Sequence, residues 1–202
     1  MKRALLLIDL QNDFCPGGAL AVNDGDATIA VANQLAAAFY QRGEAVVASQ
    51  DWHPANHGSF ASVADQPQHT VGELNGLQQI WWPDHCIQHS HGAQFHAALD
   101  TSVIEAVFYK GQDALTDSYS AFFDNGHRCK TELDNWLKSR GITSLVILGL
   151  ATDYCVKFSV LDALTLGYQV EVVRAGCRGV NLAAEDSDHA LAEMAAAGAI
   201  IS

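Results

Sequence analysis

Three side chains of this 202-residue chain could together carry nucleophilic catalysis: Asp9, Lys110 and Cys155. Cys155 lies in the first turn of a predicted helix, where the helix dipole and a nearby lysine would lower the pKa of a thiol and favour the thiolate nucleophile. Asp9 ends an apolar run, and a partly buried carboxylate beside a thiol can accept and return a proton. Each residue also has a purely structural interpretation. Asp9 could cap the N–H groups of the following loop, Lys110 could be an exposed lysine at a strand end, and Cys155 could be a buried core cysteine. Their chemistry therefore depends on whether they converge.

A second group of side chains could hold a metal ion. Asp51 and His53 lie two residues apart at the end of a predicted strand, so an extended backbone points both side chains the same way. His85 is the best candidate for a third ligand, giving a site of two histidines and one carboxylate with open positions. Weaker candidates for an additional contact are His57, Ser59 and Cys86. Zinc, iron and manganese all suit this ligand set.

These side chains meet only if the elements that carry them form a parallel sheet. Apolar runs without alternation, typical of strands covered on both faces, predict strands over 4–8, 45–49, 103–109, 145–150, 170–173 and 199–201. Helices are predicted over 26–41, 130–140, 154–166 and 184–197, followed by Gly43, Gly141, Gly167 and Gly198 as left-handed C-terminal residues. This alternation predicts a doubly wound α/β fold with helices on both faces of a parallel sheet. Ligands of such sheets bind at the carboxyl ends of the strands, where both groups would lie.

One segment interrupts this alternation. Residues 52–100 show no convincing helix or strand and are rich in His, Gln, Trp and Gly. Loops of this length in compact domains are usually functional or disordered. We therefore expect a single domain over 1–202, with a long metal-binding loop at about 52–100.

The composition excludes a disordered chain and several classes of partner. With 49% hydrophobic and 17% charged residues, the chain does not have the composition of a disordered protein. A net charge of −12 without a basic cluster argues against nucleic acids and anionic membranes. The apolar run after Arg3 ends at Asp9, too early for a signal peptide or a membrane span, so a cytoplasmic protein is expected. Five scattered cysteines predict reduced thiols, and no glycine-rich motif supports a dinucleotide or nucleoside triphosphate site.

Six motifs, taken in order, resemble those of the bacterial nicotinamidases (pyrazinamidases) in the isochorismatase-like cysteine hydrolase superfamily. They are LLLIDLQNDF at 5–14, SQDWHPANH at 49–57, WPDHC at 82–86, YKG at 109–111, DSYSAF at 117–122 and GLATDYCV at 149–156. The resemblance runs from about residue 4 to the last predicted strand, and only the C-terminus looks short.

The resemblance implies a fold and a set of site residues. The fold is a six-stranded parallel sheet in the order 3-2-1-4-5-6. The implied catalytic triad is Asp9, Lys110 and Cys155, and the implied ligands of one divalent metal ion are Asp51, His53 and His85. Zinc is the first expectation for that ion, with iron or manganese as alternatives. The resemblance also implies a cis peptide bond between Leu150 and Ala151, an oxyanion hole formed by the N–H groups of Ala151 and Cys155, and substrate ring walls formed by Phe14 and Trp82.

The reaction implied by the resemblance is hydrolysis of nicotinamide to nicotinate and ammonia in NAD salvage, through a thioester on Cys155. Pyrazinamide is expected as a further substrate. The metal ion would bind the pyridine nitrogen and would not activate the nucleophile. The expected partner is this small substrate, and no nucleic acid or membrane partner is expected. The protein could be a monomer or a homo-oligomer.

Three other functions fit parts of the pattern. A related hydrolase of carbamoyl or ureido substrates would use the same triad but would not need a metal ion beside a ring nitrogen. A non-haem iron oxygenase would use the two histidines and the carboxylate, but it normally has a β-sandwich fold and leaves the triad unexplained. A binding module without catalysis is the third alternative, and the intact Asp9, Lys110 and Cys155 count against it.

Overall fold

The main sheet has six parallel strands, as the sequence predicts. The computed structural model describes residues 2–202, in which the strands are β1 (Arg3–Ile8), β2 (Ala45–Asp51), β5 (Ala106–Lys110), β6 (Ser144–Leu150), β7 (Gln169–Arg178) and β8 (Ile200–Ile201). Their order across the sheet is β5-β2-β1-β6-β7-β8, and every neighbouring pair is parallel. The order 3-2-1-4-5-6 is therefore confirmed. β1 lies in the centre, where Leu5 pairs with Val46 on one side and Val146 on the other.

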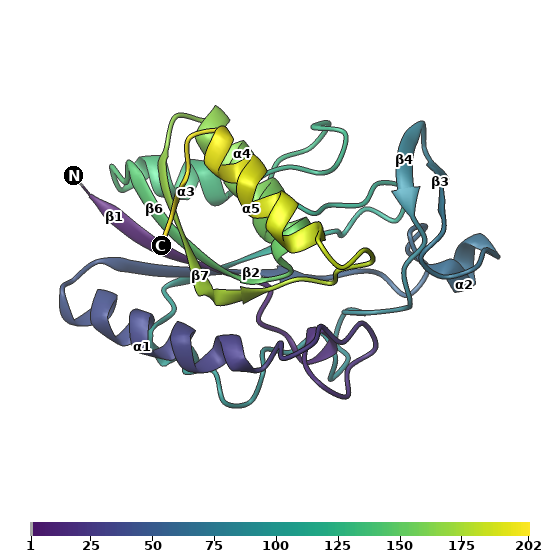
Figure 1. Cartoon of the computed structure of the whole chain (residues 1–202), viewed down its shortest axis with the longest axis horizontal. Helices are drawn as coiled ribbons and strands as arrows, with labels where there is room; N and C mark the ends of the chain where they lie inside the picture. Colours follow the sequence, from purple (N-terminus) through teal and green to yellow (C-terminus); the bar gives the residue numbers. More distant parts are fainter. Residues whose placement is uncertain (1) are drawn as a thin grey trace.

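The helices cover both faces of this sheet (Figure 1). α1 (Ala27–Gln41) lies on one face, while α3 (Leu133–Ser139), α4 (Lys157–Thr165) and α5 (Asp186–Ala196) lie on the other. Because both faces are covered, Leu5 to Ile8 of β1 are completely buried, which explains the absence of alternation in the sequence. The four glycines predicted to end helices all have positive φ angles, between 69° and 112°.

The expectation that residues 52–100 form no element is wrong in part. They contain the short helix α2 (Ala61–Ala64) and an antiparallel hairpin of β3 (Val71–Leu74) and β4 (Leu77–Ile80). Both strands have only four residues and alternate between more and less exposed positions without a continuous buried stretch, so no apolar run marks them. The turn Asn75-Gly76, with φ angles of 52° and 80°, is the signal that could have found the hairpin. In Figure 1 this hairpin and α2 project beyond the main sheet at one end of the molecule.

Three predicted elements differ from the structure in more than the exact position of their end residues. The predicted strand 103–109 divides into a 3-10 turn at Thr101–Val103 and β5, and the predicted strand 170–173 extends to Arg178. A π-helical turn, Thr152–Val156, precedes α4, so Cys155 lies in a wider turn than the α-helical start predicted for it. Within residues 2–202, no helix combines the length and the apolar character needed to cross a membrane.

Candidate active site

The ends of three strands bring Asp9, Lys110 and Cys155 together, as the sequence predicts. Asp9 directly follows β1, Lys110 ends β5, and Cys155 lies in the turn after β6; all three are almost completely buried. The Lys110 Nζ lies 2.9 Å from Asp9 Oδ2 and 3.4 Å from Cys155 Sγ. Asp9 has a φ angle of 48°, a left-handed conformation that Asp tolerates better than most residues. A proton acceptor, a cation and a thiol therefore share one buried cluster.

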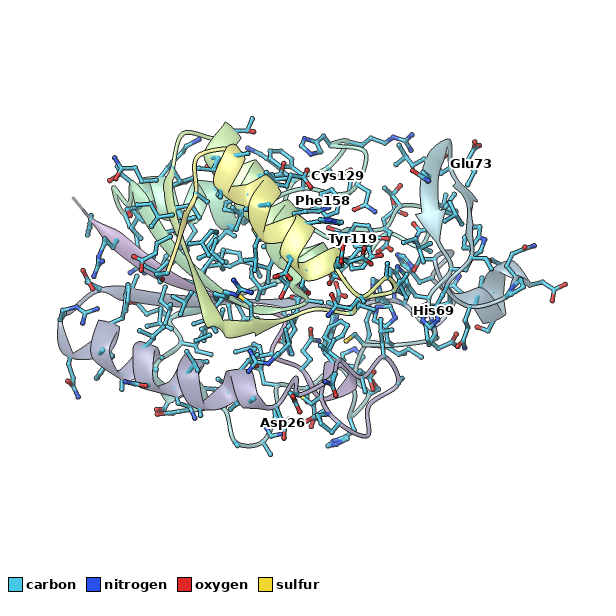
Figure 2. All side chains as sticks on the ribbon, in the orientation of Figure 1. Asp26, His69, Glu73, Tyr119, Cys129 and Phe158 are labelled. Atoms are coloured by element: carbon cyan, nitrogen blue, oxygen red, sulfur yellow. The ribbon has the colours of Figure 1, made fainter. Side chains whose placement is uncertain are left out.

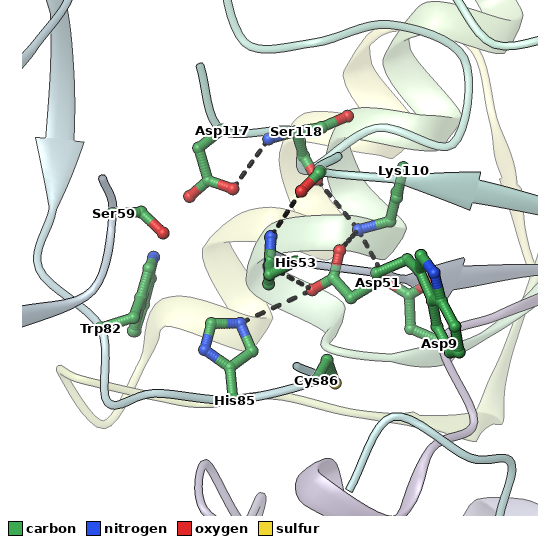
Figure 3. A network of polar contacts seen from close by, with 12 residues as sticks. Asp9, Asp51, His53, Ser59, Trp82, His85, Cys86, Lys110, Asp117 and Ser118 are labelled. Atoms are coloured by element: carbon green, nitrogen blue, oxygen red, sulfur yellow. Dashed lines mark hydrogen bonds and ion pairs between the residues drawn. The ribbon is translucent and has the colours of Figure 1, made fainter. Parts of the chain in front are cut away.

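Lys110 links this cluster to the metal-ligand candidates (Figure 3). Its Nζ also forms an ion pair with Asp51 Oδ1 and donates a hydrogen bond to the Ser118 carbonyl at 3.0 Å. Burial alone would lower the pKa of Lys110, but the carboxylates of Asp51 and Asp9 outweigh it and hold that pKa well above its usual value. Lys110 is therefore a permanent cation between two carboxylates.

The two carboxylates on either side of Lys110 have opposite pKa shifts. Burial raises the pKa of Asp9, against the lowering effect of Lys110 and of the hydrogen bond that Ser49 Oγ donates to Asp9 Oδ1 at 2.6 Å. Burial also favours the neutral form of Asp51, but Lys110 and His53 outweigh it and hold the pKa of Asp51 well below its usual value. Asp9 is thus the carboxylate that can take a proton, and Asp51 is the one that stays charged.

The expected lowering of the thiol pKa is wrong for the resting site. Burial raises the pKa of Cys155 well above its usual value, and the lowering effect of Lys110 is smaller. Asp9 and Asp51 add to the rise because two nearby carboxylates disfavour a third negative charge. Cys155 is therefore a thiol in this state, and it would need a base beside it to act as a nucleophile.

The second predicted group also converges. Asp51, His53 and His85 are buried, with ligand atoms within 4.8 Å of one another. Asp51 Oδ2 lies 3.5 Å from His53 Nε2 and 3.6 Å from His85 Nε2 (Figure 3). Each ring bonds through Nδ1 to a backbone carbonyl, that of Gly111 at 2.8 Å or Pro83 at 2.7 Å, which leaves the Nε2 lone pair free. His53 Nε2 is buried without a hydrogen-bond partner among the described residues. These donors fit a divalent metal ion.

His57, an additional candidate, differs from these two histidines. Its Nδ1 accepts a hydrogen bond from the Ser59 N–H at 3.2 Å and lies 2.7 Å from Ser59 Oγ, so the proton of a neutral ring belongs on Nε2. Burial lowers the pKa of His57 to about 4, which keeps the ring neutral. This Nε2 is buried without a partner in the described chain, and the ring lies in a cluster with His53 and Asp117. The arrangement favours His57 as a hydrogen-bond donor toward the site over a metal ligand.

Polar side chains from the turn after β1 hold the metal-ligand candidates in place. Gln11 accepts a hydrogen bond from the Asp51 N–H at 2.9 Å and donates one to the Asp51 carbonyl at 2.8 Å. Asp13 Oδ2 accepts from the Cys86 N–H at 2.7 Å, and the Cys86 carbonyl accepts from the His53 N–H at 3.0 Å. The Cys86 backbone therefore connects both histidine-bearing segments, and Cys86 acts through its backbone; its thiol is not in the group with the ligand candidates.

The predicted cis peptide bond between Leu150 and Ala151 is present. Ala151 and Cys155 line one small cavity together with the predicted ring walls Phe14 and Trp82. Asp51 and His85 line the same cavity, so the thiol and the metal-ligand candidates face a common space.

Comparison with known proteins shows which family this chain belongs to. Residues 3–202 match the family model described as the isochorismatase domain. The chain belongs to the isochorismatase family. This isochorismatase-family chain is 63% identical over 199 residues to the nicotinamidase of Escherichia coli (strain K12), covering 98% of this chain and 93% of that one. The resemblance found in the six motifs is thereby confirmed.

Two solved structures of relatives superpose over nearly the whole length of this isochorismatase-family chain. The Acinetobacter baumanii nicotinamidase/pyrazinamidase has a TM-score of 0.94 at 41% identity, covering 99% of this chain and 95% of that one. The pyrazinamidase of Pyrococcus horikoshii in complex with zinc has a TM-score of 0.82 at 35% identity, covering 100% and 99%. Both support the doubly wound isochorismatase-like fold.

Several cavity walls of this isochorismatase-family chain were not identified from the sequence. They are Leu20, Asp117, Tyr119, Tyr154 and Val180. Asp117, Tyr119 and Tyr154 lie inside two of the six motifs, so their position there was the available signal. Leu20 and Val180 lie in segments without a motif, and only the folded chain brings them to the cavity.

Proposed function

We propose that this chain is a nicotinamidase, which hydrolyses nicotinamide to nicotinate and ammonia in NAD salvage. The observation that carries the proposal is the shared cavity: Cys155 lines it together with Asp51 and His85, between the aromatic walls Phe14 and Trp82. A flat heteroaromatic amide has matching parts, with a ring for the aromatic walls, a ring nitrogen for a metal ion and a carboxamide for the thiol. The names of the relatives support the same substrate.

In the proposed mechanism, Asp9 takes the proton from Cys155 as Sγ bonds to the carboxamide carbon. Lys110 stabilises the negative charge that develops on Sγ as its proton leaves, because its Nζ lies 3.4 Å from Sγ. The N–H groups of Ala151 and Cys155 stabilise the oxyanion, where loss of one such donor typically costs about 3 kcal/mol. The tetrahedral intermediate then expels the amine with the proton from Asp9, which releases ammonia and leaves a thioester on Cys155.

The second half of the reaction uses the same residues. Asp9, again a carboxylate, takes a proton from a water molecule whose oxygen bonds to the thioester carbon. The carbon–sulfur bond breaks, Asp9 passes the proton to the Cys155 thiolate, and the carboxylic acid loses its remaining proton to solvent as it leaves as nicotinate. The raised pKa of Asp9 suits both directions of transfer, because a base works best when its pKa approaches the working pH.

The proposed metal site consists of Asp51, His53 and His85, with zinc as the first expectation and iron or manganese as alternatives. The support is the buried ligand set and the zinc complex of the Pyrococcus horikoshii relative. A divalent ion held there would supply Lewis-acid binding of the pyridine nitrogen. Pyrazinamide also carries a ring nitrogen meta to its carboxamide, as nicotinamide does, so the proposal includes it as a substrate.

The proposal also extends to the organisation of the protein. The whole chain would act as one domain, because residues from Phe14, after β1, to Val180, after β7, line a single cavity. A catalytic thiol suits a reducing compartment, so we place the reaction in the cytoplasm. A monomer or a homo-oligomer is compatible with this site, which is built within one chain.

One assay tests the proposed function. The purified protein, loaded with zinc, is incubated with nicotinamide, and released ammonia is measured beside a Cys155→Ala variant. We expect ammonia and nicotinate in equal amounts from the unmodified protein, and a loss of at least about 10⁴-fold in the variant, as for other catalytic nucleophiles. No ammonia from the loaded protein, with zinc, iron or manganese, would refute the function. Equal rates for both proteins would refute the role of Cys155.

A further inference from the structure

The cavity that faces Cys155 is too small for a substrate in the state described. Its volume is about 20 Å³, which is room for about one water molecule. A pyridine ring with a carboxamide is far larger than that. At least one wall of the cavity must therefore move when a substrate enters.

A much larger cleft lies on the other side of two of these walls. It has a volume of about 530 Å³ and extends between the β3–β4 hairpin, the loop that carries Tyr119, and helices α4 and α5. Tyr119 and Tyr154 line both the cleft and the small cavity, whereas Phe158 lines the cleft alone. In Figure 2 Tyr119 and Phe158 lie in this region, between α5 and the hairpin. The two tyrosines thus separate the thiol from an open space that could receive a displaced side chain.

Most other walls of the small cavity are fixed. Phe14, Trp82, Ala151 and Asp117 are less than 5% exposed, and the Val180 backbone is held by a hydrogen bond from its N–H to Asp153 at 2.9 Å. The half-buried walls are Tyr119, Tyr154 and Val180, and of these only the two tyrosines also line the cleft. These two residues are therefore the candidates for a movable wall.

The two tyrosines are held differently. The Tyr119 hydroxyl accepts a hydrogen bond from Trp82 Nε1 at 3.1 Å, and its ring packs against Phe158 with centroids 5.4 Å apart. The Tyr154 ring contacts Trp82 and Tyr119 edge-on, with centroids 4.9 Å and 5.4 Å away. No hydrogen bond holds the Tyr154 hydroxyl within residues 2–202. Rotation of Tyr154 into the cleft therefore breaks ring contacts only, while movement of Tyr119 also breaks a hydrogen bond.

We propose that Tyr154 is the movable wall of the active-site cavity, and that its ring sets the upper size limit for molecules that reach Cys155. This specificity role rests on the proposed function only in naming the substrate. Displacement of the ring joins the small cavity to the cleft, so a larger aromatic carboxamide could place its additional atoms where the ring had been. Tyr119 stays in place and forms the fixed edge of the opening.

The first experiment measures access to Cys155 without using catalysis. The metal-loaded protein is treated with iodoacetamide, a small thiol reagent, or with N-phenylmaleimide, a bulky one, and labelling is followed by peptide mass spectrometry. Cys129, the exposed cysteine, serves as a reference in every sample. The ratio of bulky to small labelling at Cys155 removes any change in the reactivity of the thiol itself.

In Tyr154→Ala we expect that ratio at Cys155 to rise at least about tenfold, because a minor open state is typically populated at 10% or less before the substitution. Phe158→Ala is the matched control, since it removes a ring from the same cleft but not from the cavity, and its ratio should stay within about twofold. Tyr154→Leu keeps an apolar side chain over Trp82 and should give an intermediate rise if Tyr154→Ala does not fold. An unchanged ratio in the folded Tyr154 variants, or an equal rise in Phe158→Ala, would overturn the proposal.

The second experiment measures the size limit in the reaction. Nicotinamide and the bicyclic quinoline-3-carboxamide, which keeps the ring nitrogen and carboxamide positions, are compared by kcat/KM. We expect Tyr154→Ala to raise the preference for the bicyclic amide at least about tenfold over the unmodified protein, and Phe158→Ala to leave it unchanged. An unchanged preference in Tyr154→Ala would refute the size limit. If the unmodified protein hydrolyses neither amide, the proposed function fails, while the labelling ratio still decides the role of Tyr154.

Discussion

The two halves of the candidate site are positioned by different parts of the molecule. Asp9, Lys110 and Cys155 lie at or just beyond the ends of strands in the main sheet, so strand pairing fixes their separation. His53 and His85 lie outside the sheet, in the long segment between β2 and β5, and backbone carbonyls, Asp13 and the Cys86 backbone fix their orientation. The sheet therefore positions the candidate nucleophilic group, and individual polar contacts position most of the candidate metal site.

Because of this difference, substitutions in one group should change mainly the stability of the fold, and substitutions in the other should change mainly the binding of a metal ion. A substitution that disturbs the nucleophilic group disturbs the buried charges in the core of the fold. A substitution around the histidines removes one loop contact and leaves the sheet intact. Lys110 is where the two groups meet, because it is paired with both Asp9 and Asp51. The predictions below separate the two groups, beginning with this shared residue.

Lys110→Met should have the largest effect, because it removes a buried cation from two buried carboxylates. We expect a loss of about 3–5 kcal/mol in the free energy of unfolding, the usual cost of breaking a buried ion pair, together with loss of ammonia release. An unpaired buried carboxylate has a raised pKa in the folded state, so the stability of the variant should fall as pH rises from about 4, the unfolded value, through that raised pKa. Urea unfolding at pH 5 and pH 8 measures this. An equal loss at both pH values would contradict it.

His53→Ala should affect the metal site and spare the fold. We expect zinc affinity, measured by competition with a chromogenic chelator, to fall by at least about a hundredfold, which is more than the loss of a supporting contact costs. The KM for nicotinamide should rise, because the ring nitrogen loses its binding partner. His96→Ala, at a partly exposed loop histidine whose ring is absent from the metal-ligand groups, is the control. A fall in kcat alone, with unchanged KM, would mean that the metal ion does not bind the ring nitrogen.

Asp13→Asn should have a smaller effect confined to the loop. Asp13 accepts from the Ala19 N–H through Oδ1 and from the Cys86 N–H through Oδ2, and an amide can accept through only one of these atoms. We expect zinc affinity to fall about tenfold, because the Cys86 backbone supports both histidine segments. Asp124→Asn is the matched control, since Asp124 organises its own loop by accepting three backbone N–H groups. An equal loss of zinc affinity in both variants would mean a general effect of loop loosening.

Ser49→Ala should have the smallest effect. It removes the hydrogen bond to Asp9 Oδ1 and leaves Lys110 beside Oδ2. We expect kcat/KM to fall about fivefold, corresponding to about 1 kcal/mol for one hydrogen bond, with unchanged zinc affinity. A measurable loss of zinc affinity would show that the two groups are coupled more tightly than their separate supports suggest.

The sequence predicted the parts of the fold that depend on burial. The uninterrupted apolar runs of β1 and β6 locate central strands, and the polar residues directly after them locate the active edge of the sheet. Asp51 and His53 could be paired because alternation in an extended chain is regular. The strand order came from the resemblance to a family, since an apolar run does not specify its neighbours.

The rest depends on contacts that the sequence does not state. The pKa of Cys155 follows from three-dimensional burial, which outweighs the lysine that the motif places nearby. The tautomer of His57 follows from its contacts with Ser59, and the role of Asp13 follows from its hydrogen bond to the distant Cys86. Tyr154 could be found in a motif, but its place between a cavity and a cleft exists only in the folded chain.

The central position of β1 has a consequence for synthesis of the protein. The ribosome makes β1 first, and its pairing with β2 and then β5 can begin while the remaining half of the sheet is still untranslated. Asp9, Asp51 and Lys110 can therefore assemble early, but the other edge of β1 stays open until β6 emerges. Cys155 follows β6 in the chain. Cys155 is therefore the last of these residues to be synthesised, and it follows directly on the strand that covers the open edge of β1.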